Sequence, residues 1–173
     1  MLGHTSARVG TRLGIGTRYY NEAFVRAVIQ RVSSAEVSVG GKIEGRIDRG
    51  LLVLLGVGRG DTARDAAYLA GKTAGLRIFE GADGRMTRSA RDLGAAVLAV
   101  PQFTLYGDVR RGLRPSFDGA ADPEMAVSLY EEYVGLLRDE GLEVATGVFQ
   151  AMMRVQLVNE GPVTILLDST KLL

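Results

Sequence analysis

From Val25 onward, apolar and polar residues alternate in the short runs that are typical of half-buried β-strands. Gly40-Gly41 predicts a two-residue hairpin turn between two of these runs. Leu51–Val57 is continuously apolar, as a strand buried on both faces would be, and Pro101 interrupts a later run. The predicted strands are 25–32, 35–39, 42–47, 51–57, 76–79, 96–105, 142–146, 153–158 and 163–167.

Two segments change to the helical period, with apolar residues three and four positions apart. The first begins at Asp61 or Thr62, either of which can cap a helix, and runs to about Ala74. The second begins at Asp122-Pro123-Glu124 and ends at Gly141. Because the strands outweigh the helices and do not alternate regularly with them, we predict a strand-rich, mixed α/β fold.

Residues 1–24 follow neither period and are rich in Gly, Thr and Arg. They also lack the apolar core, about 7–15 residues long, of a secretory signal. We predict that this leader is disordered, or that it is an upstream extension from a misassigned start, with Val25 in the initiator position. The folded domain is therefore predicted to span residues 25–173.

The composition narrows the chemistry that this domain can perform. The chain has no cysteine, and its one histidine is His4. A thiolate nucleophile, a zinc–cysteine site and a Ser-His-Asp relay are therefore excluded from residues 25–173. We expect no metal, no cofactor and a reducing, cytoplasmic environment. No apolar run approaches the roughly 20 residues that cross a bilayer, so we expect no membrane segment.

The charge of the chain is nearly balanced. Its formal net charge is +1, and the leader holds three arginines and one glutamate, which leaves −1 for residues 25–173. Nonspecific coating of nucleic acid requires many neutralised phosphates, so that function is disfavoured, although a local contact is not. Arg110, Arg111 and Arg114 form one basic cluster that fits either a phosphate contact or a solvated loop.

Two short polar segments stand at the ends of apolar runs. Pro101-Gln102-Phe103-Thr104 exposes backbone N–H groups where a proline ends a strand, although an ordinary strand end would look the same. Residues 159–164 read Asn-Glu-Gly-Pro-Val-Thr, and the simplest interpretation is a hairpin loop. The Gly161-Pro162 bond is also a place where a cis peptide costs little.

Together and in this order, the two segments resemble motifs of the D-aminoacyl-tRNA deacylases. The likeness covers about 25–167, including the motif Asn159-x-Gly161-Pro162-x-Thr164 and four further segments. Those segments are Arg26–Val32, Gly50–Val57, Leu76–Phe79 and Arg114–Phe117. The chain departs from the family at Pro101, where a serine is usual, so a hydroxyl hydrogen bond is missing there.

The resemblance implies two main helices packed on a curved, barrel-like sheet, in a homodimer whose active sites lie at the subunit interface. It also implies hydrolysis of the ester bond of D-aminoacyl-tRNA. A cis Gly161-Pro162 peptide from each subunit would enter the partner's site, hold the α-amino group of the substrate and exclude L side chains. Asn159, Thr164, Arg31 and Pro101 would complete the substrate-binding set, with Arg31 bracing the Gly-Pro carbonyls.

For catalysis, the resemblance implies that the 2′-OH of the tRNA assists attack by water, which agrees with the lack of histidine. Backbone N–H groups of Gln102 and Phe103 would stabilise the oxyanion. Thr104 is a nucleophile by chemistry, but no base stands beside it, so we expect it to line the site. Glycine has no side chain to exclude, so glycyl-tRNA is an expected substrate.

Two other functions fit parts of the sequence. A small-molecule or RNA-binding dimer could share the fold, with catalysis disabled by Pro101. A general esterase is the enzymatic alternative, but it lacks a histidine base and should cleave a p-nitrophenyl ester. Release of D-tyrosine from D-Tyr-tRNA distinguishes the deacylase from both.

Overall fold

The computed structural model describes residues 25–171, so the predicted leader at 1–24 lies outside the described residues. Six strands form one sheet in the order β2-β1-β3-β6-β7, with β8 on the other edge of β1, and β4 pairs with β5 alone. The bounds of the strands are β1 Arg26–Val39, β2 Lys42–Ile47, β3 Gly50–Gly56, β4 Phe79–Glu80, β5 Met86–Arg88, β6 Ala96–Pro101, β7 Val144–Thr146 and β8 Met153–Asp168. The helices are α1 Ala63–Gly75, α2 Ala90–Leu93, α3 Pro123–Asp139 and the 3₁₀ turn η1 Phe103–Tyr106.

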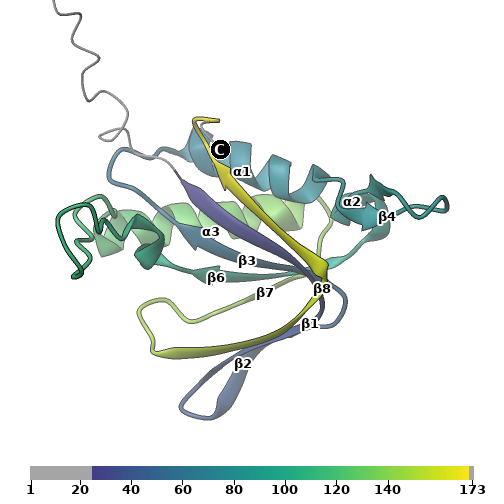
Figure 1. Ribbon diagram of the computed structural model, residues 1–173, viewed down its shortest axis with the longest axis horizontal. Coiled ribbons are helices and arrows are strands. Elements are labelled where there is room, and N and C mark those ends of the chain that lie inside the picture. Colours follow the sequence, from purple (N-terminus) through teal and green to yellow (C-terminus); the bar gives the residue numbers. More distant parts are fainter. Residues whose placement is uncertain (1–24, 172–173) are drawn as a thin grey trace, which may run out of the picture.

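The strand β1 organises the sheet because it pairs with three others. It runs antiparallel to β3 over its first half, to β2 over its second half and to β8 along its whole length. The order then continues in parallel from β3 to β6 and from β6 to β7. The long strands β1 and β8 bend together, so that the sheet curls toward a partly closed barrel (Figure 1).

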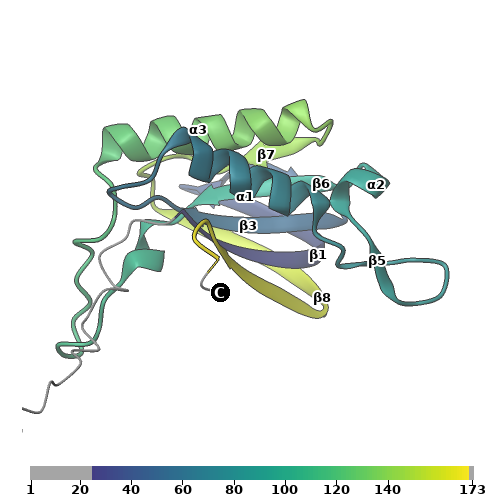
Figure 2. The ribbon, with the colours of Figure 1, turned by 90° about the horizontal axis from the view of Figure 1, so that it is seen from above.

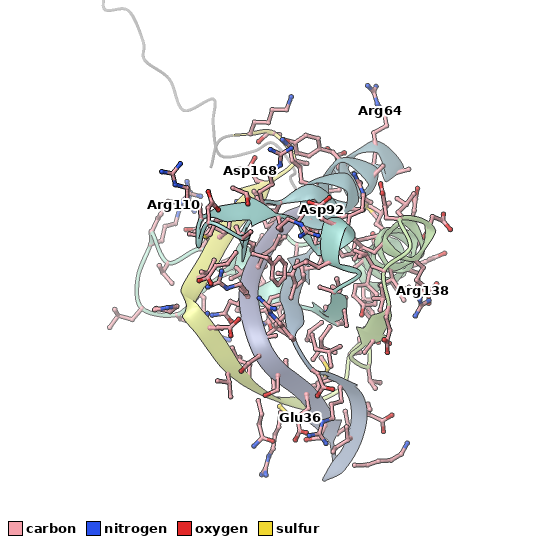
Figure 3. All side chains as sticks on the ribbon, turned by 90° about the vertical axis from the view of Figure 1, so that its right-hand side faces the viewer. Glu36, Arg64, Asp92, Arg110, Arg138 and Asp168 are labelled. Atoms are coloured by element: carbon pink, nitrogen blue, oxygen red, sulfur yellow. The ribbon has the colours of Figure 1, made fainter. Side chains whose placement is uncertain are left out.

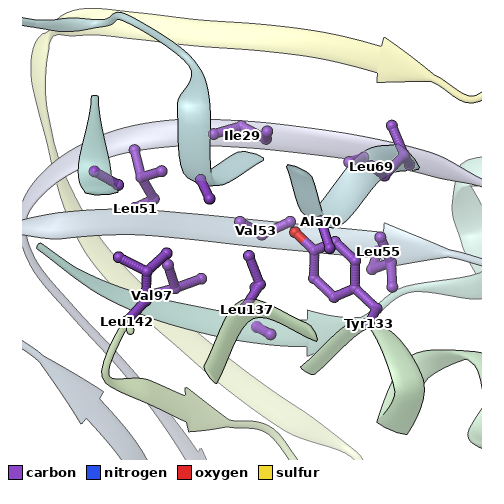
Figure 4. Packing of buried hydrophobic residues seen from close by; sticks show 14 of the residues in the cluster. Ile29, Leu51, Val53, Leu55, Leu69, Ala70, Val97, Tyr133, Leu137 and Leu142 are labelled. Atoms are coloured by element: carbon purple, nitrogen blue, oxygen red, sulfur yellow. The ribbon is translucent and has the colours of Figure 1, made fainter. Parts of the chain in front are cut away.

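Helices α1 and α3 lie side by side over one face of the sheet (Figure 2). Their apolar stripes meet the inward side chains of β1, β3 and β6, and Figure 4 shows Leu69, Tyr133 and Leu137 packed against Val53 and Leu55. The predicted caps are present: the Asp122 carboxylate accepts from the Met125 N–H, and Thr62 is the N-cap of α1. Burial of one amphipathic face thus fixes each helix.

The curl of the sheet creates a second, smaller core on its other face. Val37, Ile47, Leu52 and Leu98 are at most 4% exposed there. These residues come from β1, β2, β3 and β6, so the bent half of the sheet covers part of its own concave side. The strand-rich, mixed α/β class with two main helices on a curved sheet is confirmed.

Several predicted boundaries were wrong. The stretches 25–32 and 35–39 form one strand, β1, because β8 supports it throughout. The run 76–79 is extended only at its last residue, and the run 96–105 ends as a strand at Pro101 and continues as η1. The short elements β5 and α2 were not predicted, since three exposed residues and a four-residue helix carry too little periodicity.

No helix among the described residues is long and apolar enough to span a membrane.

A carboxyl group, that of Asp61, is buried between the end of β3 and the start of α1. Asp61 is 4% exposed, its Oδ2 accepts from the Gly58 N–H at 2.5 Å, and its Oδ1 has no partner. Burial, with the nearby charge of Asp65, raises the pKa of Asp61 to about 7.

This pKa predicts an unusual dependence of stability on pH. Between the ordinary value of 3.8 and about 7, the folded state holds a proton on Asp61 that the unfolded state has lost. The free energy of unfolding should therefore decrease as pH rises through this window, by at most about 1.4 kcal/mol per pH unit. Urea unfolding at several pH values measures the difference in free energy of unfolding between the wild type and Asp61→Asn. The wild type should become less stable relative to Asp61→Asn as the pH rises toward neutrality.

Asp92→Asn is the matched control for this experiment. The pKa of Asp92 is lowered by the N–H and hydroxyl of Ser89, so its removal should give a difference that does not vary across the same window. A difference between wild type and Asp61→Asn that is also constant with pH would contradict the raised pKa.

Candidate active site

The segment 159–164 is not a hairpin loop, as the sequence suggested, but a wide bulge within the continuous strand β8. Gln30 of β1 pairs with Thr164, and Val32 pairs with Asn159. One residue of β1, Arg31, therefore lies opposite four residues of β8, 160–163. The surplus residues leave the ladder and turn outward, and both Gly161 and Pro162 are exposed.

The side chain of Asn159 closes the neck of this bulge. Its Oδ1 accepts from the Val163 N–H at 2.7 Å, and its Nδ2 donates to the Val163 carbonyl at 3.1 Å. The same Nδ2 lies 3.2 Å from the Thr164 hydroxyl, to which Gln30 also donates. An asparagine side chain thus supplies the hydrogen bonds that a strand neighbour would supply. Asn159 and Thr164 are parts of the frame beneath the bulge.

Arg31 supports the bulge from below and is only 5% exposed. Its Nε donates to the Glu160 carbonyl at 3.0 Å, and its Nη1 donates to the Ile78 carbonyl at 2.6 Å. The hydrogen bond that we expected to a Gly-Pro carbonyl is instead to the carbonyl one residue earlier. The Glu160 carboxylate lies 3.9 Å from both Arg31 and Arg49, so the guanidinium is also compensated electrostatically.

Only glycine fits at position 161. Its φ is +131°, and a Cβ there would lie 2.8 Å from Cγ2 of Val163 and 3.1 Å from Nη2 of Arg31. The Gly161-Pro162 peptide is cis, in agreement with what the family resemblance implied. The bulge therefore presents bare main chain at the surface, backed by a buried guanidinium.

The second motif lies where β6 ends. Gln102 donates its backbone N–H to the Leu55 carbonyl of β3 at 2.7 Å, and the chain then enters η1. The expectation that the Gln102 N–H is an oxyanion donor is therefore wrong, because this N–H is already paired. The first N–H groups of the turn itself, beginning with that of Phe103, have no acceptor within it, so they are available for other partners. Thr104 is exposed, and its hydroxyl accepts a hydrogen bond from the Gln102 side-chain amide. The hydrogen-bond neighbour of Thr104 is an amide and not a base.

Phe103 is 58% exposed, and its ring meets Phe117 edge-on with ring centres 5.1 Å apart. Phe117 belongs to the loop that follows η1, which is closed by hydrogen bonds between the backbones of Asp108 and Ser116. The basic cluster occupies this loop. Arg110 points outward (Figure 3), and its guanidinium is paired with the Asp108 carboxylate, which lowers the pKa of that carboxyl.

The two motifs do not meet within one chain. The bulge lies level with Arg31, whereas Gln102 is bonded to Leu55, which pairs with Ala27 four residues away along β1. Four residues span about 13 Å, and the three strand spacings from β8 to β6 add about 14 Å at right angles. Some 20 Å of sheet, as an order-of-magnitude estimate, therefore separates the bulge from η1.

A hollow of about 700 Å³ lies elsewhere, lined by residues that include Arg46, Arg49, Phe79 and Glu143. None of the predicted site residues lines it. Both motifs stand instead on open surface, which is suited to a macromolecular substrate or a second subunit and not to an enclosed small molecule. Residues 25–171 contain no group of three or more side chains able to hold a metal ion.

Sequence reasoning missed three residues at η1: Arg26, Asp61 and Tyr106, the last of which ends the turn. The Arg26 guanidinium lies 4.6 Å from the Tyr106 ring centre, and Tyr106 lies against Asp61. Tyr106 lies two residues after Thr104, the end of the motif, but a lone tyrosine gives no sign of burial. The contact of Arg26 depends on the pairing of distant strands, which no local pattern reveals.

Comparisons with known proteins give matches over most of the chain. The profile of the family described as D-Tyr-tRNA(Tyr) deacylase matches residues 28–168. A D-aminoacyl-tRNA deacylase of Koribacter versatilis (strain Ellin345) is 64% identical over 147 residues, 85% of this chain and 99% of that protein. The structure of a c-Myc DNA Unwinding Element Binding Protein has a TM-score of 0.77 at 38% identity, covering 82% of this chain and 97% of that one.

A second solved structure, described as that of "a probable eukaryotic D-amino acid tRNA deacylase", has a TM-score of 0.73 over 84% of this chain and 99% of that one. At 18% identity it supports the fold alone. The family profile and the relative from Koribacter versatilis each span most of the chain, and the profile's range includes both the bulge of β8 and η1. The chain belongs to the D-Tyr-tRNA(Tyr) deacylase family.

Proposed function

We propose that this chain hydrolyses the ester bond of D-aminoacyl-tRNA and admits substrates by handedness at the bulge of β8. Membership of the family supports deacylation, which is an ester hydrolysis. The observation that carries the finer proposal is the bare main chain at Gly161-Pro162, exposed above the buried Arg31. The substrate's α-amino group would be held there, beside the carbonyls of this segment.

Selection would act by exclusion. Main-chain atoms cannot change rotamer, and Asn159 and Arg31 hold this segment at its neck and from below. An L side chain would meet that segment, whereas a D side chain would point toward solvent. Such a site tolerates many D-amino acids because it contacts none of their side chains. It also admits glycine, so we include glycyl-tRNA among the substrates.

Catalysis would depend on position and on backbone donors. The only histidine of the chain is His4, so residues 25–171 hold no imidazole base. We propose that the tRNA's 2′-OH assists attack by water and that the Phe103 N–H stabilises the oxyanion, because the Gln102 N–H is already donated to the Leu55 carbonyl. Thr104, whose hydroxyl is bonded to an amide, would line the site. The exposed ring of Phe103 would pack against the terminal adenosine.

A second copy of the chain would complete each site. The bulge and η1 of one chain are about 20 Å apart, so only a partner can bring the two motifs together. Beside the bulge, Val158 and Leu166 of β8 are 57% and 52% exposed. Apolar side chains on a sheet face next to the site are suited to a subunit interface. We therefore propose a homodimer that carries its active sites at the interface.

Replacement of Gly161 tests whether the exposed Gly161-Pro162 segment selects substrates by handedness. Gly161→Ala should reduce release of D-tyrosine from D-Tyr-tRNA by about tenfold or more, because the new Cβ must displace Val163 or Arg31. L-Tyr-tRNA should survive with the wild type. Gly84→Ala is the matched control, since Gly84 also has a positive φ, +72°, but has no atom within 4 Å of the added Cβ. Unchanged turnover by Gly161→Ala, or equal hydrolysis of both substrates by the wild type, would overturn the selector assignment.

Replacement of Thr104 distinguishes a lining residue from a nucleophile. Thr104→Ala should keep D-Tyr-tRNA turnover within about fivefold of the wild type, because it removes a hydrogen bond to Gln102 and no reacting atom. Complete loss in Thr104→Ala, with recovery in Thr104→Ser, would instead identify the hydroxyl as the nucleophile. Single-turnover kinetics provide the measurement.

The homodimer is tested by charge placed on the sheet face. Leu166→Glu should yield a monomer with little activity, because a carboxylate cannot be buried unpaired at the interface. Leu113→Glu, in the loop after η1 where Leu113 is fully exposed, should leave the mass in solution unchanged. Light scattering after gel filtration gives the mass. A wild type that is monomeric and fully active would refute the shared site.

A further inference from the structure

The turn η1 exposes its first residues and buries its last one. Phe103 is 58% exposed, whereas Tyr106 is only 7% exposed. The groups to which the proposed chemistry is assigned, at Gln102–Thr104, therefore stand on the solvent side of a turn whose position depends on what holds its far end. At that far end, Leu105 and Tyr106 make the contacts that hold the turn against the rest of the fold.

The Tyr106 ring lies in a narrow slot that is lined by three glycines. A Cβ at Gly58 would lie 2.7 Å from the Tyr106 hydroxyl oxygen, and one at Gly56 or Gly119 would lie 3.3 Å from the ring. None of these glycines has a positive φ, so close approach and not backbone conformation explains the lack of a side chain. At the bottom of the slot the hydroxyl lies 3.5 Å from Oδ2 of the buried Asp61.

Arg26 covers the open side of this slot. Its guanidinium carbon lies 4.6 Å from the Tyr106 ring centre, and its Nη1 donates to the Leu105 carbonyl at 2.8 Å. One planar cation therefore contacts two consecutive residues at the end of the turn, one through a π face and one through a hydrogen bond. Arg26 begins β1, so it is fixed by the pairing of that strand with β3 and β8.

We propose that Arg26 is a positioning residue for the Gln102–Thr104 turn, acting through Leu105 and Tyr106. It touches no reacting atom and fixes the orientation in which the turn presents its N–H groups. The inference rests on the proposed function for its effect on turnover, and on the geometry alone for its effect on the order of the turn. These two consequences are measured separately.

The first measurement is hydrogen exchange of the amides of residues 102–107. Arg26→Met and Tyr106→Leu should each increase exchange in this segment by about tenfold. Arg26→Met removes both the hydrogen bond to the Leu105 carbonyl and the contact with the Tyr106 ring, and Tyr106→Leu removes the ring contact. Arg26→Lys, which retains a cation and a donor, should restore part of the protection. Gly58→Ala should increase exchange as well, because it displaces the Tyr106 hydroxyl while Arg26 stays intact.

The second measurement is single-turnover and steady-state deacylation of D-Tyr-tRNA by the full chain. Arg26→Met should lower kcat by about tenfold and leave KM within about twofold. The kcat of the double variant Arg26→Met/Tyr106→Leu should be no lower than that of the less active single variant, because both substitutions remove the same contact. Lys72→Met is the matched control, because Lys72 lies over the Tyr68 ring at 5.6 Å on α1. It should change neither exchange at 102–107 nor kcat.

Protected amides at 102–107 in folded Arg26→Met would overturn the proposal, and so would a wild-type kcat in that variant. A lower melting temperature with unchanged kcat would identify Arg26 as merely structural and would also overturn it. If the wild type released no D-tyrosine, the proposed function would fail, while the exchange experiment would still decide the role of Arg26.

Discussion

The unequal pairing of β1 with β8 is the constraint on which the candidate site depends. One residue of β1 faces four of β8, so the buried backbone groups of the bulge need hydrogen-bond partners other than the strand ladder. Asn159 satisfies it at the neck, and the buried guanidinium of Arg31 satisfies the Glu160 carbonyl from beneath. Removal of either group would leave buried polar atoms without partners, and the exposed Gly161-Pro162 segment would lose its defined position.

The same strand supports both motifs with an arginine. Arg31 holds the bulge, and Arg26, five residues earlier, holds the end of η1 through the Leu105 carbonyl. Side chains five positions apart in a strand point to opposite faces, so β1 supports one motif from each side of the sheet. Because β1 is the strand with the most partners, both supports rest on the most firmly paired part of the fold.

The features that could be predicted from the sequence are those that a local pattern of residues determines. The cap at Asp122 and the buried strand β3 were predicted, and the first helix start was narrowed to Asp61 or Thr62, because each leaves a signal within a few residues. The composition of Asn-x-Gly-Pro predicts a hairpin loop at 159–164, and only the register with β1 shows that this segment is a bulge of β8. The contact of Arg26 with Tyr106 joins residues 80 positions apart, so no local pattern could predict it.

The proline at 101, where the family resemblance leads us to expect serine, is compatible with the end of β6. Successive N–H groups of a strand point to opposite neighbours, and the Gln102 N–H points to Leu55 of β3. The backbone nitrogen of residue 101 therefore points toward β7, whose ladder with β6 has ended at Thr146. A residue without an N–H costs no ladder bond at that point. What the chain lacks is a hydroxyl beside Gln102, and the proposed backbone donor, the Phe103 N–H at the start of η1, does not require that hydroxyl.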